Sequence, residues 1–576
     1  MKRIVITGSG IVSAIGIGKQ ETLESLLREQ SGIGPMCHLE SVHRLPVGEV
    51  RLSNEEIRKR FIYDGQASRS ALLGILAARE ALEEAGINKG LLAKSALISG
   101  TTVGGMETTE RDYLHWEPGE NLETMALHDA GSTTETIAAA LGGVAFCTTT
   151  STACSSALNA IISGANMLLA GDAECVIAGG TECLSKFHLN GFNALMILDR
   201  EPCRPFDDTR AGLNLGEGAA YVVLETEEHA LQRGATILAY LSGYCNACDA
   251  YHQTASSENG EGAYLAMKGA LRMAQLQPAS IDYVNAHGTA TPNNDQSEAN
   301  ALKRVFGEQL PAISSTKSLT GHTTSASGSV ETVICLICMK YGFVPANVNF
   351  HTPMANGIIP VAHNEQKQLT HVMCNSFAFG GNDSCLILSS SSYGETPLGR
   401  KMDFSVHESA TITIDGATDY RQYLSAMEAR RMTEQMRRVI VAARQALEQA
   451  KVSVPDAIIT GTEWGCLVNT VQFLDPLCRE GEEGLKPTSF MQSTHNTVSS
   501  VLAMQLKCHG YNSTFSHGPN SFEHAKRDAT NLLKLGLAET ALVIGFDEAD
   551  ERWNNLLGKV GRQVQNIAKA VVLKSR

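Results

Sequence analysis

Ser151-Thr-Ala-Cys-Ser-Ser156 places a cysteine among small residues, immediately before an apolar stretch that is typical of a buried helix. A sharp turn from a strand into that helix would expose the Cys154 sulfur and its own backbone N–H. The start of a helix also carries positive partial charge, which favours the thiolate, the form of cysteine that attacks a thioester. The stretch therefore predicts a nucleophilic cysteine on a strand–turn–helix unit of an α/β protein.

Two histidines lie in similarly distinctive surroundings. His287 lies in Asn285-Ala-His-Gly-Thr-Ala-Thr291, and His322 lies in Lys317-Ser-Leu-Thr-Gly-His322. A nucleophile with two imidazoles suggests carbon–carbon bond formation on thioesters. Two neutral imidazoles could donate hydrogen bonds to the thioester oxygen of the enolate that forms when a malonyl group loses carbon dioxide.

These surroundings resemble those of the β-ketoacyl-acyl-carrier-protein synthases, over roughly residues 1–390. The resemblance implies a thiolase-like layered α/β/α/β/α fold with two halves, about 1–240 and 241–390. It implies acyl transfer to Cys154 and decarboxylative condensation with malonyl-acyl carrier protein, giving a 3-oxoacyl product. Acyl carrier protein would be the partner, its phosphopantetheine would carry both substrates, and neither a metal nor another cofactor is expected.

The resemblance assigns roles to residues near the histidines. Lys317 and Glu331 match a lysine and a glutamate of the family, and we expect a partly buried ion pair that orients the imidazoles. A plain structural salt bridge is the alternative. Thr289 and Thr291 match the hydroxyl pair that contacts the phosphopantetheine arm, with turn capping as the alternative.

A glycine-hinged loop, Phe377-Ala-Phe-Gly-Gly381, resembles the gating loop of these synthases. The N–H groups of Phe379 and Cys154 would form the oxyanion hole, and Phe379 would swing aside to admit the acyl chain. Ala378 replaces the usual glycine of the family, so we expect a stiffer loop. Phe377 and Met106 are further candidates for contact with the substrate.

A degenerate repeat of the cysteine-bearing half follows a predicted linker at 391–401. Ala77-Ala-Arg-Glu-Ala-Leu-Glu-Glu-Ala85 returns as Ala442-Ala-Arg-Gln-Ala-Leu-Glu-Gln-Ala450. Residues 402–576 copy only this half, so the second thiolase-like unit is expected to be a single half without the histidines.

The repeat has lost its cysteine. Ungapped alignment of Glu182 with Glu548 places Asn520 opposite Cys154, and an asparagine cannot attack a thioester. The repeat resembles the non-catalytic chain-length factors, specifically the truncated partner in aryl-polyene and flexirubin-type pigment pathways. It would form a pseudo-dimer with a catalytic domain, within one chain or between chains, and would shape the acyl tunnel or stabilise the dimer.

Composition excludes several classes of protein. A net charge of −14 argues against a general nucleic-acid binder. The 15 cysteines lack the spacing of a disulfide scaffold, and no apolar run is long enough to span a bilayer, so we expect a cytoplasmic protein. Locally, we expect a strand at Arg3–Thr7, its turn at Gly8-Ser-Gly10, and a helix at Ala71–Ala85.

Three alternative functions remain open. The protein could be a housekeeping fatty acid elongation synthase rather than a pigment-pathway enzyme. It could be a non-catalytic scaffold or chain-length partner, which the intact Cys–His–His set opposes for residues 1–390 and which suits 402–576. A biosynthetic thiolase would use one histidine and a second cysteine, so the two-histidine pattern argues against it.

Overall fold

A long hydrogen-bonded path of strands runs through the whole chain in the computed structural model, which describes residues 2–61, 63–391, 405–549 and 551–575. Within these residues the path forms a 16-stranded sheet, with β2 (Gly16–Ile17) as a side branch on β1. In spatial order, the other strands are β11 (Ala312–Ser314), β10 (Tyr283–Asn285), β14 (His371–Ala378), β15 (Asn382–Ser389), β9 (Ala239–Cys248), β1 (Ile4–Ser13), β8 (Gly218–Thr226), β7 (Cys175–Glu182), β5 (Ala96–Gly100), β6 (Phe146–Thr150), β18 (Tyr511–Phe515), β17 (Ala457–Gly461), β19 (Thr540–Asp547), β20 (Ile567–Ser575) and β16 (Val406–Ile414).

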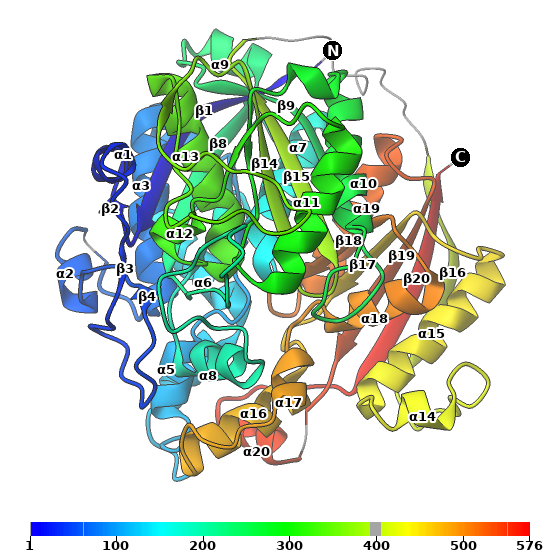
Figure 1. The fold of residues 1–576 in the computed structure, drawn as a ribbon. Coiled ribbons are helices and arrows are strands. Elements are labelled where there is room, and N and C mark those ends of the chain that lie inside the picture. Colours follow the sequence, from blue (N-terminus) through cyan, green and yellow to red (C-terminus); the bar gives the residue numbers. More distant parts are fainter. Residues whose placement is uncertain (1, 62, 392–404, 550, 576) are drawn as a thin grey trace.

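Helices cover the sheets or connect their strands (Figure 1). The principal packed helices are α3 (Arg69–Ala85), α6 (Ala130–Leu141), α7 (Ser156–Ala170), α10 (Glu261–Ala274), α11 (Pro292–Phe306), α13 (Ser327–Tyr341), α15 (Glu434–Ala450), α18 (Thr497–Leu506) and α19 (Ser521–Lys534). Further helices are α5 (Met106–Asp112), α8 (Lys186–Ala194), α16 (Leu467–Arg479), α17 (Pro487–Met491) and α20 (Glu551–Lys559).

The first two-thirds of the chain form five layers. Helices α7 and α13 are sandwiched between the β1–β8–β7–β5–β6 sheet and the β9–β15–β14–β10–β11 sheet. Helix α3 packs on the outer face of the first sheet, and α10 packs on the outer face of the second. The main core fills the space around α7 and α13, because both helices are buried on nearly every side. This confirms the predicted thiolase-like α/β/α/β/α fold.

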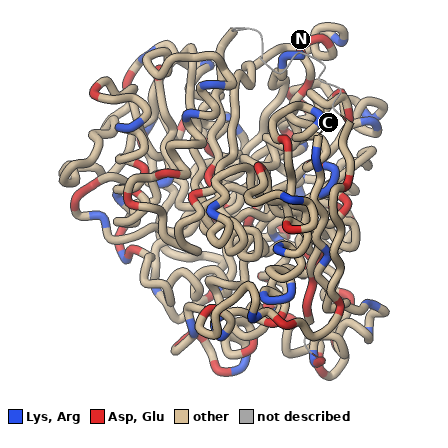
Figure 2. The backbone as a smooth tube through the Cα atoms, turned by 90° about the vertical axis from the view of Figure 1, so that its right-hand side faces the viewer, with Lys and Arg blue, Asp and Glu red and all other residues tan. Residues whose placement is uncertain are grey.

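The C-terminal unit is one sheet with helices on both faces, so it matches half of the larger unit. Helix α15 packs against β16, β19 and β20 on one face, and α19 packs against β17 and β19 on the other. In Figure 1 this unit, coloured yellow to red, lies beside the larger one. Figure 2 faces this side of the molecule and shows acidic and basic residues interspersed over it.

The two units join edge to edge within one chain. Thr150 of β6 lies opposite Phe515 of β18 in an antiparallel bridge. The N–H of Ser151 donates to the carbonyl of Thr514 (2.8 Å), and the N–H of Ser516 donates to the carbonyl of Thr149 (2.9 Å). The two bonds are related by a local pseudo-twofold axis. The pseudo-dimer is therefore intrachain in this structure, and the edge of β6 is occupied by the chain's own repeat.

Buried polar groups add specificity to this junction. The backbone N–H of Asn512 donates to Asn246 Oδ1 (2.7 Å), and Asn382 Nδ2 donates to the carbonyl of Asn512 (2.6 Å). Ser163 of α7 donates to Asp528 of α19 (2.9 Å). Because each of these side chains is buried and paired, separating the units would leave polar groups without partners.

Helix α19 has a polar outer face, which suits a unit that lacks the second sheet of the larger unit. Its counterpart α7 is buried along almost its whole length, between the two sheets and against α13 and α19. In α19 only one face is buried, and the outer face carries charged residues such as Glu523, Arg527 and Lys534. An amphipathic helix can cover a sheet while facing water, so the repeat folds without a second sheet above it.

Two local predictions need correction or comment. The strand at Arg3–Thr7 does not turn at Gly8-Ser-Gly10, because β1 continues to Ser13. A Cβ on Gly8 would lie 2.2 Å from the carbonyl oxygen of Ala81 in α3, so these glycines admit the helix rather than form a turn. Apart from Ser391, the predicted linker at 391–401 lies outside the described residues.

The expectation that no apolar run is long enough to span a bilayer was wrong for the described part of the chain, because one helical stretch, Ala153–Ala170, passes the test of length and composition. It is 89% buried inside the fold and includes α7, the central helix between the two sheets.

Candidate active site

Cys154 lies on a strained turn between β6 and α7. The turn is a single 3₁₀ segment, Ala153–Ser155, and Ala153 has a φ of 52°, in the left-handed region. Ser156 Oγ donates to the Ala153 carbonyl (2.7 Å) and accepts from the Thr152 N–H (2.9 Å), and Ser376 donates to the Cys154 carbonyl (2.9 Å). These bonds hold the sulfur in a fixed position ahead of the helix.

His322 faces the cysteine directly. Its Nε2 lies 3.2 Å from Cys154 Sγ, and its Nδ1 lies 2.8 Å from Ser327 Oγ. Burial and the nearby positive charge of Lys317 hold the pKa of His322 well below its usual value, so the ring is neutral. A thiol that donates to Nε2 leaves the ring hydrogen on Nδ1, facing Ser327. His322 can therefore accept the thiol proton and later return it.

His287 lies beside His322, with ring centroids 5.4 Å apart. Lys317 Nζ lies 3.3 Å from His287 Nδ1 and also forms a buried ion pair with Glu331. An ammonium can only donate, so Nδ1 is the acceptor and the neutral ring carries its hydrogen on Nε2. Burial, Lys317 and His322 together keep the pKa of His287 well below its usual value. The ring is thus held as a neutral donor.

Glu331 and Lys317 form the predicted pair. Burial raises the pKa of Glu331 to about 7, while the ammonium of Lys317 opposes that shift. Glu331 Oε2 has no hydrogen-bond partner, although it is buried. The ion pair contacts His287 directly through Lys317. The two alternatives, a structural salt bridge and a pair that orients the imidazole, are therefore compatible with the same contact.

The Cys154 thiol is less acidic than the sequence suggested. Burial raises its pKa to about 11, although Lys317 and hydrogen bonds from the N–H groups of Phe379 and Cys154 oppose the shift. Desolvation of the charged sulfur therefore outweighs the nearby ammonium and the two hydrogen bonds that favour the thiolate. The same two N–H groups were predicted to form the oxyanion hole, and both face the sulfur.

Alkylation of Cys154 should consequently rise with pH over an unusually high range. Because the folded-state pKa is raised, the thiolate fraction at neutral pH is small and should grow about tenfold per pH unit up to roughly pH 10. Iodoacetamide labelling at a series of pH values, read by peptide mass spectrometry, measures the rate. A plateau already near pH 8 would instead indicate a preformed thiolate–imidazolium pair.

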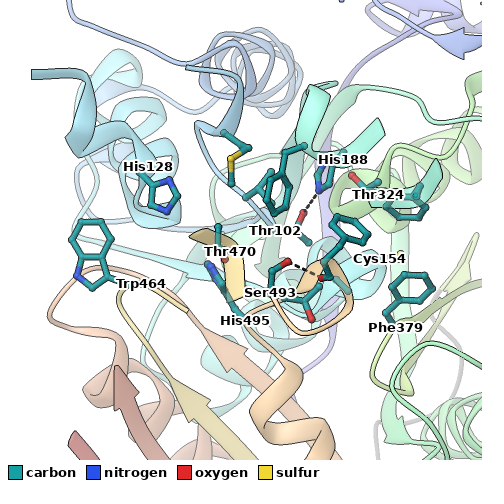
Figure 3. A pocket seen from close by; sticks show the side chains of 17 residues that line it. Thr102, His128, Cys154, His188, Thr324, Phe379, Trp464, Thr470, Ser493 and His495 are labelled. Carbon is teal, nitrogen blue, oxygen red and sulfur yellow. Dashed lines mark hydrogen bonds between the residues drawn. The ribbon is translucent and has the colours of Figure 1, made fainter. Parts of the chain in front are cut away.

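A narrow cavity begins at Cys154 and runs between the two units (Figure 3). The space open to the centre of a water molecule is only about 40 Å³. Figure 3 places His128 and Trp464 on the opposite side of the pocket from Cys154. The larger unit contributes Thr102, Val103, Met106, His128, Ala153, Cys154, Phe187, His188, Phe192, Thr324 and Phe379, and the C-terminal unit contributes Trp464, Thr470, Phe490, Ser493, Thr494 and His495.

Aromatic rings close the cavity near the cysteine. Phe379 stacks on Phe192, with centroids 5.7 Å apart and planes 18° apart. Phe192 in turn meets Phe490 of the C-terminal unit edge to face at 5.5 Å. A Cβ on Gly191 would lie 2.1 Å from the Phe490 ring, so the glycine lets the two units come this close. The ring of Phe379 thus lies where the cavity meets the cysteine.

The remaining predicted substrate residues divide between two places. Met106 lines the cavity, as the sequence suggested. Thr289 and Thr291 hydrogen-bond to each other (2.9 Å) in the loop after His287, and Phe377 packs against the His287 ring at 6.0 Å. Those three are not among the residues that line the described cavity.

Glu298 is a site residue that the sequence did not reveal. Its carboxylate accepts from the N–H of His287 (2.9 Å) and of Gly288 (2.8 Å), so it fixes the histidine loop from α11. Eleven positions separate it from His287, but α11 begins only at Pro292, so no single periodic element relates the two residues. Only the folded structure brings them together.

The turn before α19 is the repeat's equivalent of the turn that carries Cys154, and we call these two strand–turn–helix turns the second and the first elbow. Their geometry shows that the alignment of the repeat was wrong by one residue. Ser521 Oγ accepts from the His517 N–H and donates to the Gly518 carbonyl, both at 2.7 Å, as Ser156 does in the first elbow. Gly518 has a φ of 54°, matching Ala153. Pro519, rather than Asn520, therefore occupies the position of Cys154. Both residues are exposed, and neither is a nucleophile.

The one-residue error in the alignment came from pairing the wrong acidic residues near the ends of β7 and β19. Glu182 accepts from Thr101 and Thr102 at the end of β5, and Asp547 accepts from Thr462 and the following backbone at the end of β17. Asp547 is thus the counterpart of Glu182, one position before Glu548. The sequence alignment missed this equivalence because the counterpart of Glu182 is the shorter aspartate, and another glutamate follows it directly.

Among the described residues, no group of three or more His, Cys, Asp or Glu is arranged to hold a metal ion.

A five-layer fold with a cysteine elbow, two neutral imidazoles and two N–H groups at the sulfur defines a thiolase-like condensing enzyme. Family comparison agrees: residues 1–230 match the β-ketoacyl synthase N-terminal domain, and residues 238–351 match its C-terminal domain. A second N-terminal domain of this kind matches residues 406–575. The chain belongs to the β-ketoacyl synthase family and is an acyl-condensing transferase.

Individual relatives support this assignment. 3-Oxoacyl-[acyl-carrier-protein] synthase 2 of Coxiella burnetii is 36% identical over 416 residues, covering 67% of this chain and 98% of that protein. The ishigamide ketosynthase/chain length factor superposes with a TM-score of 0.64 at 29% identity, covering 68% of this chain and all of that one. The PfaC keto synthase–chain length factor covers the whole of this chain and 78% of its own, with a TM-score of 0.81 at 18% identity, and so shares the fold.

Proposed function

We propose that this protein catalyses decarboxylative Claisen condensation of an acyl thioester with malonyl-acyl carrier protein. Residues 1–390 hold the chemistry, and the C-terminal unit shapes the acyl cavity. The product is a 3-oxoacyl-acyl carrier protein in a polyene or related polyketide pathway, and the enzyme acts in the cytoplasm. The observation that carries this proposal is the cavity that starts at the Cys154 sulfur and is lined by both units.

Acyl transfer comes first. The Cys154 thiol gives its proton to His322 Nε2 as the sulfur attacks the acyl carbonyl. The N–H groups of Cys154 and Phe379 receive the oxyanion. The carrier thiol then leaves with the proton from His322. The acyl group remains on the sulfur, with its chain in the cavity.

Condensation follows on the histidine side. The malonyl thioester loses carbon dioxide, and the resulting enolate oxygen accepts a hydrogen bond from His287, which presents its Nε2 hydrogen. Once the sulfur is acylated it no longer donates to His322, so that ring can accept from the Ser327 hydroxyl at Nδ1 and present a hydrogen on Nε2 as the second donor. The enolate carbon attacks the acyl carbonyl, and Cys154 departs as the thiolate, which is protonated again. Thr289 and Thr291 are suited to the neutral amides of the phosphopantetheine arm.

Polyene extension is favoured over bulk fatty acid synthesis by the character of the cavity. Its walls are rich in flat rings, including Phe187, Phe192, Phe490 and Trp464. A conjugated chain is itself flat and stacks well on such rings, whereas a saturated chain gains no comparable benefit. The retained, nucleophile-free half gives a second wall whose sequence can vary without disturbing the catalytic residues.

Filling the cavity from the C-terminal unit should shorten the accepted chain. Thr470, 7% exposed on α16, lines the cavity, and Thr470→Phe should slow Cys154 acylation by a long acyl-carrier protein about tenfold. Acetyl transfer should be unchanged because it occupies only the space at the sulfur. Intact-protein mass spectrometry with both donors measures this.

Thr488→Phe, at an exposed position on the adjacent α17, is the matched control and should leave both rates unchanged. Equal treatment of long and short donors by Thr470→Phe would refute the assignment of this cavity to the acyl chain.

A further inference from the structure

The gating loop of the catalytic unit is held by side chains of the other unit. Asn496, immediately before α18, donates through Nδ2 to the carbonyl of Phe379 (2.9 Å). Ser500, on the next turn of α18, donates through Oγ to the carbonyl of Gly380 (2.9 Å). Two successive carbonyls of the loop therefore accept hydrogen bonds from α18 and its first flanking residue, which belong to the nucleophile-free repeat.

The catalytic unit holds the same loop mainly through other atoms, although the Cys248 thiol also lies 3.8 Å from the Gly380 carbonyl oxygen. The Gly380 N–H donates to the Gln253 carbonyl (2.7 Å), and the Asp249 N–H donates to the Gly381 carbonyl (2.7 Å). The Phe379–Gly380 segment is thus clamped between the two units. Removing the contacts from α18 would leave the glycine end anchored and free the carbonyl of Phe379.

The contact is closely built. Asn496 is 1% exposed and Ser500 is 2% exposed. Gly380 has a φ of 87°, and a Cβ at that position would lie 2.8 Å from Asn496 Nδ2. A glycine is therefore required both for the backbone angle and for the approach of the amide. The glycine at position 380, the burial of both side chains and their hydrogen bonds together hold α18 against the loop.

We propose that Asn496 and Ser500 are positioning residues that latch the gating loop in the arrangement in which the Phe379 N–H faces the Cys154 sulfur. Fixing the carbonyl of Phe379 restricts rotation of the peptide on either side of its ring. The nucleophile-free unit thereby completes the oxyanion hole of the catalytic unit in addition to lining its cavity. This inference rests on the proposed function, since the hole matters only if Cys154 takes an acyl group.

The latch is also suited to opening. Asn496 Oδ1 is buried and has no hydrogen-bond partner in this closed arrangement. An unpaired buried acceptor raises the free energy of the state that contains it, so the closed loop is favoured without being locked. Opening breaks two hydrogen bonds and the stack of Phe379 on Phe192, and an entering acyl chain can compensate for these losses by filling the cavity.

The test separates acyl transfer from access to the sulfur. The double variant Asn496→Ala/Ser500→Ala should acylate Cys154 about tenfold more slowly with acetyl-carrier protein, because the oxyanion donor is no longer held. Alkylation of Cys154 by iodoacetamide needs no oxyanion hole, and its rate per thiolate, taken from the pH profile of each variant, should become faster as the loop opens. Opposite changes in the two rates at one sulfur are the expected signature.

Ser499→Ala is the matched control, because its hydroxyl lies on the same helix and donates to the Asn496 carbonyl instead of the loop. It should change neither rate. Faster alkylation at other buried cysteines would reveal unfolding, which peptide mapping and the melting temperature detect, and the single variants Asn496→Ala and Ser500→Ala would then carry the test. Wild-type rates in folded variants would overturn the latch, whereas failure of the wild type to acylate would overturn the proposed function.

Discussion

Cys154→Ala should abolish acyl loading and lower condensation by more than about a thousandfold, because no other group can hold the acyl chain. The imidazoles do not depend on the sulfur for their orientation, since Lys317 holds His287 and Ser327 contacts His322. Decarboxylation of malonyl-carrier protein should therefore persist in this variant. Carbon dioxide release and product formation, measured in parallel, separate the two activities.

Cys338→Ala is the control for the loss of a buried thiol, because Cys338 lies in the apolar helix α13 away from the cavity lining. It should retain both activities. Condensation by Cys154→Ala at more than a few per cent of the wild-type rate would remove the cysteine from its proposed role.

His287→Ala should produce the converse separation. His287 has no hydrogen bond to the sulfur, whereas His322 does, so acylation of Cys154 should continue within about threefold of the wild-type rate. Decarboxylation and condensation should fall by about 100- to 1000-fold, the usual loss when one oxyanion donor is removed. Acyl-enzyme mass and carbon dioxide release measure the two steps.

The comparison variant is His322→Ala, which should lose acyl loading because its Nε2 receives the thiol proton, and decarboxylation because the same nitrogen is the proposed second donor to the enolate. If His287→Ala blocked acylation as severely as His322→Ala, the division of labour between the two imidazoles would be wrong. Near-normal decarboxylation in His287→Ala would exclude it as the enolate donor.

Local sequence patterns predicted the elements that carry the chemistry. The helix expected at Ala71–Ala85 extends over Arg69–Ala85, and the apolar stretch after Cys154 forms the buried helix α7, as expected. Helical periodicity and apolar content are short-range properties, so they can be recognised without a structure. The turn expected at Gly8 failed because those glycines serve a contact with α3, about 70 positions away.

The site was predicted unevenly for a similar reason. Cys154, His287 and His322 lie in short, distinctive stretches, and the structure brings all three together. Glu298, Asn496 and Ser500 have no such pattern, because each matters only through a partner far away in the chain. The second elbow was placed one residue late, since an aspartate in the repeat replaces the longer Glu182.

The sequence by itself determined the chemistry of this protein: a thiol, two imidazoles and a repeat that lacks the nucleophile are all properties of residue identity and short spacing. Only the tertiary structure decided that the repeat completes its own chain's catalytic unit. This association of the two units depends on the edge pairing between β6 and β18 and on the close approach of α18 to the loop that contains Gly380. Such contacts join surfaces that lie hundreds of residues apart, and their complementarity of shape and hydrogen bonding leaves no local pattern in the chain.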